Sequence, residues 1–311
     1  MSILLTGVEG FVGHNLAESF LAKGYSMLSP KKTELDLTDP ASVDKYFRDN
    51  EIQTIVHCAT TERVDTSFPP NTCENNLRMF FNLEKQLTPS MKLINLGSGS
   101  EYGRKYWSKK MAEEYFDEHV PEDGHSYAKY VISKYIIGKN DPNLICLRIF
   151  GIYGKYEDYR YKFISNAIVK NLLKMPIVIN QNVVYDYIYI NDFFRMIEHF
   201  IGHRTKHSIF NATPEEPVDL VTIAELINKV GDYKSEVIVL NKGIGVEYSG
   251  DNKKLLSEMK GFKFMPHEKA IADLCRYYAS IKDTLDINAI KQDDYLQYAK
   301  KLKSDYFDKK K

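Results

Sequence analysis

Tyr130 and Lys134 stand four residues apart, and their side chains have complementary acid–base chemistry. Four residues are about one turn of a helix, so both side chains would project from the same helix face. A Lys ammonium beside a phenol favours the phenolate and lowers the pKa of the phenol from its ordinary value of about 10. Such a phenol can transfer a proton near neutral pH, which the interconversion of a carbonyl and an alcohol requires. The same spacing also arises by chance on solvated helices, so its weight depends on the rest of the chain.

A glycine turn follows the first apolar run of the chain, residues 3–5, and leads into a helical pattern. Strand, glycine turn and helix is the context in which a glycine-rich motif binds a dinucleotide. Gly7 would permit the tight turn, Gly10 would admit a pyrophosphate close to the backbone, and Gly13 would let the helix pack on the strand. The phosphates would meet free N–H groups and the positive dipole end of this helix, which begins with Phe11 and Val12. These flanks favour a cofactor site over an ordinary glycine turn.

The Gly-x-x-Gly-x-x-Gly spacing, taken with Tyr130 and Lys134, resembles the extended branch of the short-chain dehydrogenase/reductase superfamily, the nucleotide-sugar epimerase/dehydratase/reductase family. Further motifs similar to those of the family occur in the same order, from about residue 3 to about residue 279. They are the segments 35–39, 55–59, 96–103, 147–154 and 185–192, with Asn76 and Asn82 between the second and the third. The resemblance therefore rests on many ordered matches.

The resemblance implies a catalytic set of Ser98, Tyr130 and Lys134. Ser98 would donate a hydrogen bond to a substrate carbonyl oxygen, and Tyr130 would protonate that oxygen as hydride arrives from a nicotinamide. Lys134 would hold the nicotinamide ribose hydroxyls. The resemblance also implies cofactor contacts in two further motifs, namely Asp36 and Leu37, which would meet the adenine, and Cys58 and Ala59, which would line the cofactor turn.

Departures from the family motifs narrow the reaction. The 4,6-dehydratases carry Thr-Asp-Glu where this chain has Ser98, Gly99 and Ser100, so it lacks the acid and base needed to eliminate water. Glu101 comes one residue late and is expected to face the other way along the strand. The epimerase–reductase that makes GDP-fucose has a Cys in the place of Ser100, and a serine is a much weaker acid. The sequence thus argues against both dehydration and C3/C5 epimerisation.

The second predicted strand ends without an acidic residue that could bind the ribose 2′-hydroxyl of NAD. Lys31 and Lys32 follow it and offer positive charge to a 2′-phosphate, and Arg63 is a further candidate. The sequence therefore predicts a preference for NADP(H), with NAD(H) possible. A solvated surface loop is the alternative interpretation of the two lysines.

Candidate substrate contacts are Ser100, Arg160, Lys162, Tyr185 and Lys254. Relatives usually have Arg in the position of Tyr185 and often Asn in that of Gly151, and both losses weaken the transfer of nucleotide-sugar binding to this chain. Arg160 and Lys162 could supply the charge for the phosphates, and Lys254 matches a family lysine. Surface charges and core aromatics are the alternative interpretations.

The sequence accordingly predicts a reductase of a nucleotide-linked 4-keto-6-deoxy sugar that acts in glycan precursor synthesis. A nucleotide-sugar 4-epimerase with tightly bound NAD is the alternative enzyme. A catalytically silent NAD(P)-binding sensor or scaffold is the alternative from another class of protein, and the intact Ser98, Tyr130 and Lys134 argue against it.

Composition fits a cytoplasmic enzyme. Lys plus Arg and Asp plus Glu both number 42, so no nucleic-acid partner is indicated. No apolar stretch approaches the roughly 20 residues of a membrane span, and no signal peptide is visible. Four scattered cysteines, Cys58, Cys73, Cys146 and Cys275, are expected to be free thiols and not metal ligands.

Alternating apolar runs and helical patterns predict an α/β fold, a Rossmann-like doubly wound parallel sheet with a smaller C-terminal α/β substrate lobe. Strands are expected near 2–6, 25–29, 53–58, 92–97 and 144–149, and helices near 11–23, 40–49, 72–87, 107–118 and 126–139. The lobe is expected to contain a helix at 160–173, strands at 177–179 and 208–211, and a helix at 220–230.

The predicted domains are an NAD(P)-binding domain of residues 1–155 plus about 185–203, and a lobe of about 156–184 and 204–282. Residues 283–311 form a charged extension, expected as a solvated tail, with an amphipathic helix as the alternative. The family resemblance implies a homodimer formed through the helices near 72–87 and 126–139.

Overall fold

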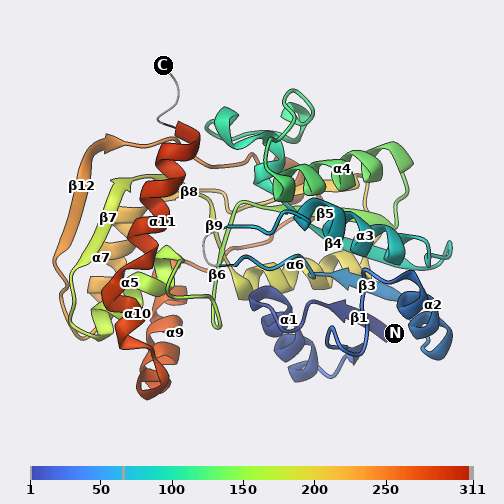
Figure 1. Ribbon diagram of the computed structural model, residues 1–311, viewed down its shortest axis with the longest axis horizontal. Coiled ribbons are helices and arrows are strands. Elements are labelled where there is room, and N and C mark those ends of the chain that lie inside the picture. Colours follow the sequence, from blue (N-terminus) through green and yellow to red (C-terminus); the bar gives the residue numbers. More distant parts are fainter. Residues whose placement is uncertain (1, 65–66, 308–311) are drawn as a thin grey trace.

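The computed structural model describes residues 2–64 and 67–307. Strands and helices alternate through the first half of the chain, as β1 (Ser2–Thr6), α1 (Phe11–Ala22), β2 (Ser26–Leu28), α2 (Pro40–Asp49), β3 (Thr54–His57), α3 (Thr72–Glu84), β4 (Lys92–Ser98), α4 (Gly124–Lys139) and β5 (Leu144–Ile149). Among the described residues, six parallel strands form one sheet in the order β10-β5-β4-β3-β1-β2, where β10 is Ile209–Ala212 (Figure 1). The predicted doubly wound parallel sheet is confirmed.

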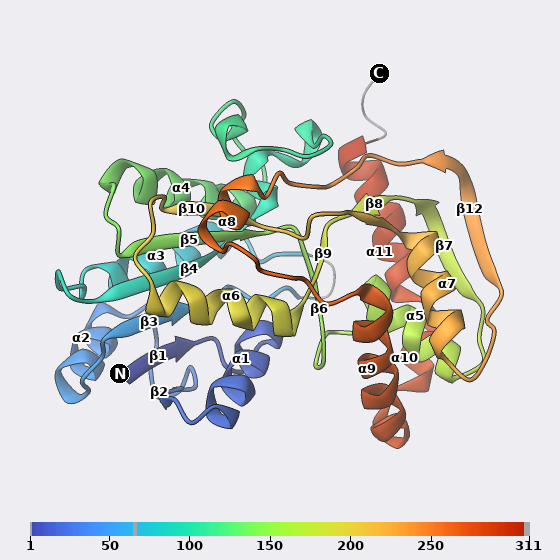
Figure 2. The same ribbon diagram turned by 180° about the vertical axis from the view of Figure 1, so that it is seen from behind.

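Successive residues of β1 pack on opposite faces of this sheet, as the two-residue period of a strand requires. Ile3 and Leu5 join the core that contains α1 and α6 (Ile190–Gly202), whereas Leu4 joins the core that contains α2, α3 and α4 (Figure 2). All three side chains are fully buried. Because helices cover both faces, β3, β4 and β5 are buried along almost their whole length.

The lobe lies beside the carboxyl ends of the strands, and its described elements come from several parts of the chain (Figure 1). They are β6 (Gly151–Tyr153), α5 (Phe163–Leu172), β7 (Ile177–Asn182), β8 (Val184–Tyr185), β9 (Tyr187–Tyr189), β11 (Val218–Asp219), α7 (Leu220–Val230), β12 (Val237–Ile244) and α9 (His267–Ser280). The helix α8 (Lys253–Glu258) instead lies against β10 of the central sheet (Figure 2). β7 pairs with β12, and α5, α7 and α9 pack together. The buried apolar residues of α5 and α7 continue the core of α1 and α6 without a break.

One strand assigned to the lobe from the sequence belongs to the central sheet. β10 pairs in parallel with β5, with Ile209 opposite Cys146 and Ala212 opposite Ile149. α6 carries the chain back along the sheet, so the next apolar run reaches the open edge of β5. A short apolar run specifies a buried strand but not the sheet it will join, which is why the sequence placed it wrongly.

The helix predicted near 107–118 is also wrong. This segment contains only the short turn η3 (Glu113–Tyr115), and its Lys110 and Asp117 have the positive φ angles of 53° and 76°. Backbone hydrogen bonds join Met111 to Ser249 and Asp251 in the opposite segment. The Glu113 carboxylate accepts from the backbone N–H of Asn211 in β10, at 2.8 Å. Tertiary pairing therefore overrides the helical propensity of this acidic, Ala- and Met-containing segment.

The charged extension is helical over α10 (Ile287–Gln292) and α11 (Asp294–Leu302), followed by a π-helical turn, Lys303–Phe307. The solvated tail expected for this segment is therefore wrong, and the alternative of an amphipathic helix is correct for the described part. α11 packs on β7. It also reaches the nucleotide-binding half, where Arg63 donates to the Tyr298 hydroxyl and Lys301 donates to Ser67 at 3.1 Å. The lysines at 309–311 lie outside the described residues.

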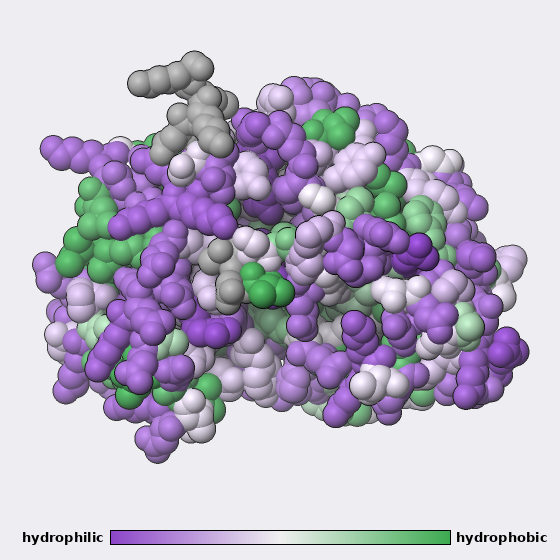
Figure 3. All heavy atoms as spheres, in the orientation of Figure 1, coloured by the Kyte–Doolittle hydropathy of each residue, from purple (hydrophilic) through white to green (hydrophobic). Residues whose placement is uncertain are grey.

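Hydrophilic side chains cover most of the face seen in Figure 3, and the hydrophobic ones on it are scattered. Across residues 2–64 and 67–307, no helix combines the length and the apolar character needed to cross a membrane. In the same residues, no cluster of three or more His, Cys, Asp or Glu side chains could hold a metal ion.

Candidate active site

The carboxyl ends of parallel strands meet at one edge of the sheet, where α/β proteins bind their ligands. The glycine turn follows β1, Cys58 and Ala59 follow β3, and Ser98 ends β4. The backbone register places Thr6 opposite His57 and His57 opposite Asn95, so β4 extends three residues farther, to Ser98 opposite Ile149. The fold therefore brings three of the predicted motifs to one edge.

Close packing of backbone requires glycine at two positions of the turn. Gly7 has a φ of +71°, and a Cβ there would lie 2.6 Å from the backbone N of Ala59. A Cβ on Gly13 would lie 2.1 Å from the carbonyl oxygen of Gly7. At Gly10, in contrast, the nearest atom would be an ordinary 3.5 Å away. Internal packing thus leaves space above Gly10, in the position where a pyrophosphate would approach.

The N-terminus of α1 faces this space without a side-chain cap. Gly10 is the N-cap residue, no side chain accepts from the first turn, and that turn contains no acidic residue. A helix N-terminus with free N–H groups is a phosphate site by its geometry and its dipole. Phe11 and Val12 belong to this turn, so the residues present fit a dinucleotide.

The motif expected to meet the adenine is fixed by local hydrogen bonds. The Asp36 carboxylate accepts from the backbone N–H and the hydroxyl of Thr38, at 2.9 and 2.7 Å, and these bonds lower its pKa. Leu37 is buried, and its carbonyl oxygen accepts from the Asn82 amide at 2.9 Å. Asn82 therefore links α3 to the loop after β2.

The loop after β3 is held in a similar way. The backbone N–H of Ala59 donates to the Thr6 hydroxyl at 3.3 Å, and that of Thr61 donates to the Asn76 side chain at 2.8 Å. Burial raises the pKa of the Cys58 thiol to about 12, so this cysteine stays protonated and is unsuited to act as a nucleophile.

Lys31 and Lys32 are exposed in the loop after β2. The backbone N–H of Lys32 donates to the carboxylate of Glu9, a residue of the glycine turn, at 3.1 Å. The two lysines therefore lie next to the turn. Arg63 lies elsewhere, because its guanidinium packs 4.5 Å from the ring centroid of Phe68 and contacts Tyr298.

α4 places Tyr130 and Lys134 on one face, with the ammonium 3.3 Å from the phenol oxygen. The helix begins at Asp123, whose carboxylate accepts from the backbone N–H and the hydroxyl of Ser126, at 2.9 and 2.7 Å. The acid is a strong N-cap and sets where the helix starts. The contact expected between the phenol and the ammonium is present.

The lowered pKa expected for Tyr130 is wrong. Its hydroxyl donates to the Asp117 carboxylate, which also lies 2.9 Å from the Lys134 ammonium through both of its oxygens. The hydrogen bond to Asp117 raises the pKa of Tyr130, burial adds to the rise, and Lys134 opposes it. Because the Asp117 carboxylate contacts both Tyr130 and Lys134, Tyr130 is a neutral phenol in the free protein.

Ser98 lies at a compact turn. Its hydroxyl oxygen accepts from the backbone N–H and from the hydroxyl of Ser100, at 3.1 and 2.9 Å. Its side chain also hydrogen-bonds with Tyr248, and a Cβ on Gly99 would lie 2.6 Å from the Tyr248 hydroxyl oxygen. Burial raises the pKa of Tyr248, so its hydroxyl beside Ser98 is neutral.

Glu101 is the buried anchor of this turn. Its carboxylate accepts from the backbone N–H of Ser98 at 2.8 Å, the hydroxyl of Ser133 at 2.6 Å and the guanidinium of Arg148 at 2.7 Å. The Glu101 and Arg148 side chains are 0% exposed. Ser133 belongs to α4, so this carboxylate joins the Ser98 turn to the helix of Tyr130.

The other predicted substrate residues are dispersed. Ser100 and Tyr185 lie near the turn, because Ser100 bonds to Ser98 and Tyr185 forms a backbone bridge with Tyr248. Lys254 forms an ion pair with Glu114 at 2.5 Å.

Arg160 pairs with Asp158 at 2.8 Å and lines a separate pocket in the lobe with Tyr156 and Tyr277. Lys162 is the N-cap residue of α5. No contact in the described structure joins Arg160 or Lys162 to the Ser98 turn or to Tyr130.

Sequence reasoning missed Asp117, Trp107 and Tyr248. Trp107 and Tyr248 stack with their ring centroids 3.7 Å apart, above the Ser98 turn. They come from segments 141 residues apart, and no spacing in the sequence signals their contact. Asp117 precedes Tyr130 by thirteen residues in an irregular segment, so helix periodicity could not place it either.

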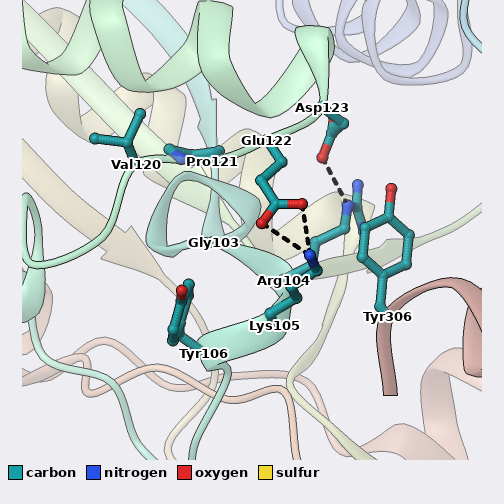
Figure 4. A pocket seen from close by; sticks show the side chains of 9 residues that line it. All are labelled: Gly103, Arg104, Lys105, Tyr106, Val120, Pro121, Glu122, Asp123 and Tyr306. Carbon is teal, nitrogen blue, oxygen red and sulfur yellow. Dashed lines mark hydrogen bonds and ion pairs between the residues drawn. The ribbon is translucent and has the colours of Figure 1, made fainter. Parts of the chain in front are cut away.

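A small pocket lies beside this region, between the turn at Gly103–Tyr106, the segment before α4 and Tyr306 (Figure 4). Two ion pairs cross it, Arg104 with Asp123 at 3.2 Å and Lys105 with Glu122 at 2.6 Å. Asp123 is the N-cap of α4, so the pocket wall and the helix that carries Tyr130 and Lys134 share a residue. The pocket does not include Ser98, Tyr130 or Lys134.

The chain matches the model of the NAD dependent epimerase/dehydratase family over residues 3–212. It therefore belongs to this family. Among curated proteins it is 22% identical to GDP-L-colitose synthase of Yersinia pseudotuberculosis over 306 residues, which cover 91% of this chain and 99% of that protein.

Solved structures agree on the fold. A GDP-mannoheptose C4 reductase from Campylobacter jejuni with NADP bound aligns with a TM-score of 0.75 and 18% identity, over 89% of this chain and 98% of that one. A Thermus thermophilus UDP-glucose 4-epimerase in complex with NAD aligns with a TM-score of 0.72 and 19% identity, over 90% and 99%. Both structures contain a nicotinamide cofactor, NADP in the first and NAD in the second.

Proposed function

We propose that this member of the NAD dependent epimerase/dehydratase family reduces the 4-keto group of a nucleotide-linked 4-keto-6-deoxy sugar, with a preference for NADP(H). One observation carries the proposal. Tyr130 is a protonated phenol on the helix that Glu101 joins to the Ser98 turn, and Glu101 itself is fully engaged with Arg148, Ser133 and the backbone of Ser98. The site therefore offers a proton donor for ketone reduction but no free acid and base at the turn for dehydration.

The proposed mechanism assigns one task to each side chain. The bound nicotinamide supplies the hydride. Ser98 and Tyr130 donate hydrogen bonds to the ketone oxygen, and Tyr130 transfers its proton to that oxygen as the alcohol forms. Lys134 binds the nicotinamide ribose hydroxyls and stabilises the phenolate that Tyr130 becomes, because the ammonium lies 3.3 Å from the phenol oxygen.

We propose cofactor contacts at the glycine turn and its neighbouring strand ends. Gly7, Gly10, Phe11, Val12 and Gly13 would hold the pyrophosphate, Asp36 and Leu37 the adenine, and Cys58 and Ala59 the nicotinamide side. Lys31 and Lys32 would bind a 2′-phosphate, which supports NADP(H), although NAD(H) stays an alternative. The preference is tested by comparing the dissociation constants of NADPH and NADH for the protein and for a Lys31→Ala/Lys32→Ala variant.

The experiment that tests the function is reduced-nicotinamide oxidation with a panel of 4-keto-6-deoxy sugars linked to GDP, CDP, dTDP or UDP. GDP comes first, because two of the proteins compared above, GDP-L-colitose synthase and GDP-mannoheptose C4 reductase, refer to GDP-linked sugars in their names. We expect oxidation of NADPH with one nucleotide series, and faster than oxidation of NADH. No oxidation with any sugar, and NAD retained by the purified protein, would instead favour the 4-epimerase.

Tyr130→Phe is the matched variant for this assay. Loss of the proton donor should lower kcat by about 10²- to 10⁴-fold. Binding of NADPH, measured by fluorescence, should change little, because the phenol hydroxyl is not a phosphate ligand. A near-normal kcat would contradict the role given to Tyr130.

We also propose a homodimer through α3 and α4, which pack against each other. α4 carries two large hydrophobic side chains on its surface, Tyr127 and Ile137, exposed by 41% and 45%. A sedimentation mass near twice 36.0 kDa is expected, and a monomer at micromolar concentration would contradict it.

A further inference from the structure

Asp117 is placed on the catalytic pair by an unusual backbone conformation. Its φ of 76° lies in the left-handed region, which Asp and Asn tolerate better than other residues with side chains. The preceding residue, Phe116, is fixed, because its ring lies under the Arg148 guanidinium at 4.2 Å and packs 5.1 Å from the ring of Tyr130. The chain turns after this anchor, and the Asp117 carboxylate points at Tyr130 and Lys134.

This carboxylate occupies the donors that the reaction needs. A phenol has a single proton, and in the free protein Tyr130 donates it to Asp117. Lys134 has three donors, and it contacts both Asp117 oxygens at 2.9 Å and the Tyr130 oxygen at 3.3 Å. Neither side chain can serve a ketone and two ribose hydroxyls while these contacts persist.

We propose that Asp117 is a positioning residue that acts through Tyr130 and Lys134, holding both donors in the free enzyme and releasing them when the substrate ketone and the ribose hydroxyls take its place. The proposal rests on the proposed role of Tyr130 as proton donor. In the free enzyme the phenol of Tyr130 then stays protonated, and the Lys134 ammonium stays paired with a carboxylate. Substrate and cofactor must compete with Asp117 for these two side chains.

The surroundings allow this exchange. The Asp117 and Lys134 side chains are 46% and 57% exposed, so water can replace each partner. Between η3 and the start of α4, residues 116–123 form no helix or strand. Release of Asp117 therefore breaks two side-chain contacts and no regular secondary structure.

Few other charges face Tyr130. Lys134 comes from α4, and Asp117 comes from the loop. On the far side of Phe116, Arg148 of β5 is neutralised by Glu101 of the Ser98 turn. Another titratable neighbour is Tyr127, one turn back on α4, with its ring centroid 6.2 Å from that of Tyr130. The Asp117 carboxylate is thus the acid bonded directly to the phenol in the described structure, and it raises the pKa of Tyr130.

Asp117→Asn tests the proposal, because Asn keeps the size and also tolerates a positive φ. Glu118→Gln is the matched control, since it removes the same charge one residue later from an exposed side chain that affects Tyr115 and not Tyr130. The first measurement is the titration of Tyr130 by ¹³C NMR of labelled tyrosines, with Tyr130→Phe identifying the signal. The midpoint should fall by about 1 pH unit or more in Asp117→Asn, and should not move in Glu118→Gln.

The second measurement is the dissociation constant of NADPH from fluorescence. Asp117→Asn should bind NADPH severalfold more tightly, because the Lys134 ammonium no longer has to break an ion pair before it binds the ribose hydroxyls. An unmoved Tyr130 midpoint would overturn the proposal. Weaker NADPH binding would also overturn it, because it would mean that Asp117 helps to bind NADPH. Neither measurement requires a substrate, so a wrong substrate class and a wrong role for Asp117 give different results.

With a substrate in hand, the alkaline limb of the reductive kcat/KM profile should move to lower pH in Asp117→Asn by the same amount as the NMR midpoint, since kcat/KM reports groups of the free enzyme. An unmoved limb would contradict the proposal. The Glu118→Gln profile should superimpose on that of the unmodified protein.

Discussion

Two carboxylate–cation pairs lie on either side of Phe116, and they differ in nearly every respect. Glu101 and Arg148 are 0% exposed, and Glu101 also binds Ser98 and Ser133. Asp117 and Lys134 are about half exposed, and their shared neighbour is Tyr130. Glu101 and Arg148 join the Ser98 turn, α4 and β5, whereas Asp117 and Lys134 both contact the single side chain of Tyr130.

The difference shows how one site combines rigidity and exchange. A buried ion pair is weak evidence for stability in itself, but removal of one partner leaves a desolvated charge and is costly. An exposed pair contributes little and can be replaced by water or a ligand. Glu101 and Arg148 therefore hold the turn and the helix in register, while Asp117 and Lys134 are free to change partners.

Breaking the buried pair should have the largest effect. Glu101→Ala leaves the Arg148 guanidinium buried without its carboxylate and removes the acceptor of Ser98 and Ser133. We expect a loss of about 3–5 kcal/mol in the free energy of unfolding, measured with urea. A loss below about 1 kcal/mol would mean that water or another acceptor replaces Glu101, and the rigid half of the comparison would fail.

A third carboxylate sharpens the comparison, because it is buried without a close cation. Asp186 accepts from the backbone N–H of Gly250 at 2.6 Å, and the Lys110 ammonium is 4.0 Å away. Burial raises the pKa of Asp186 to about 7, from an ordinary value of about 4. The folded protein then holds a proton that the unfolded chain releases, so the stability from this group falls as pH rises from about 4 to about 7.

Asp186→Asn should flatten this decline in stability. The amide resembles the protonated acid, so the variant should equal the unmodified protein near pH 4 and exceed it in stability above pH 7. Glu157, whose pKa burial also raises to about 7, keeps a residual slope in both proteins. Urea unfolding at several pH values measures the effect, and parallel curves for the two proteins would contradict it.

The exposed pair should give the smallest effect on stability. Asp117→Asn is expected to leave the unfolding midpoint within experimental error, at low and at high salt, because water solvates both partners. A clear loss of stability would show that Asp117 is a structural residue, and the contrast with Glu101 would disappear.

The nucleotide-binding half follows from its sequence because its signals are local. The apolar run before Gly7, the glycine spacing and the helix behind it interact with their neighbours along the chain, and the structure has the strand, turn and helix where they were expected. The contact of Tyr130 with Lys134 also depends only on helix geometry.

The remainder depends on partners that are distant in the chain. The backbone of Met111 hydrogen-bonds to Ser249 and Asp251, and its segment forms no α-helix. The strand that begins at Ile209 pairs with the edge of β5. The protonation of Tyr130 is set by Asp117 in an irregular loop, whose direction no periodicity encodes. Charge and spacing predicted that Tyr130 and Lys134 lie together, but not that the Asp117 carboxylate contacts both.

The contacts of α11 have a consequence for the order in which the protein is completed during synthesis. Its residues Tyr298 and Lys301 leave the ribosome after the whole central sheet, and they contact Arg63 and Ser67, which were made far earlier. Domains fold largely as they emerge, N-terminal parts first. The parallel sheet up to β5 can thus form while the loop after β3 still lacks its final partners, so a nascent chain acquires its core before this loop is secured.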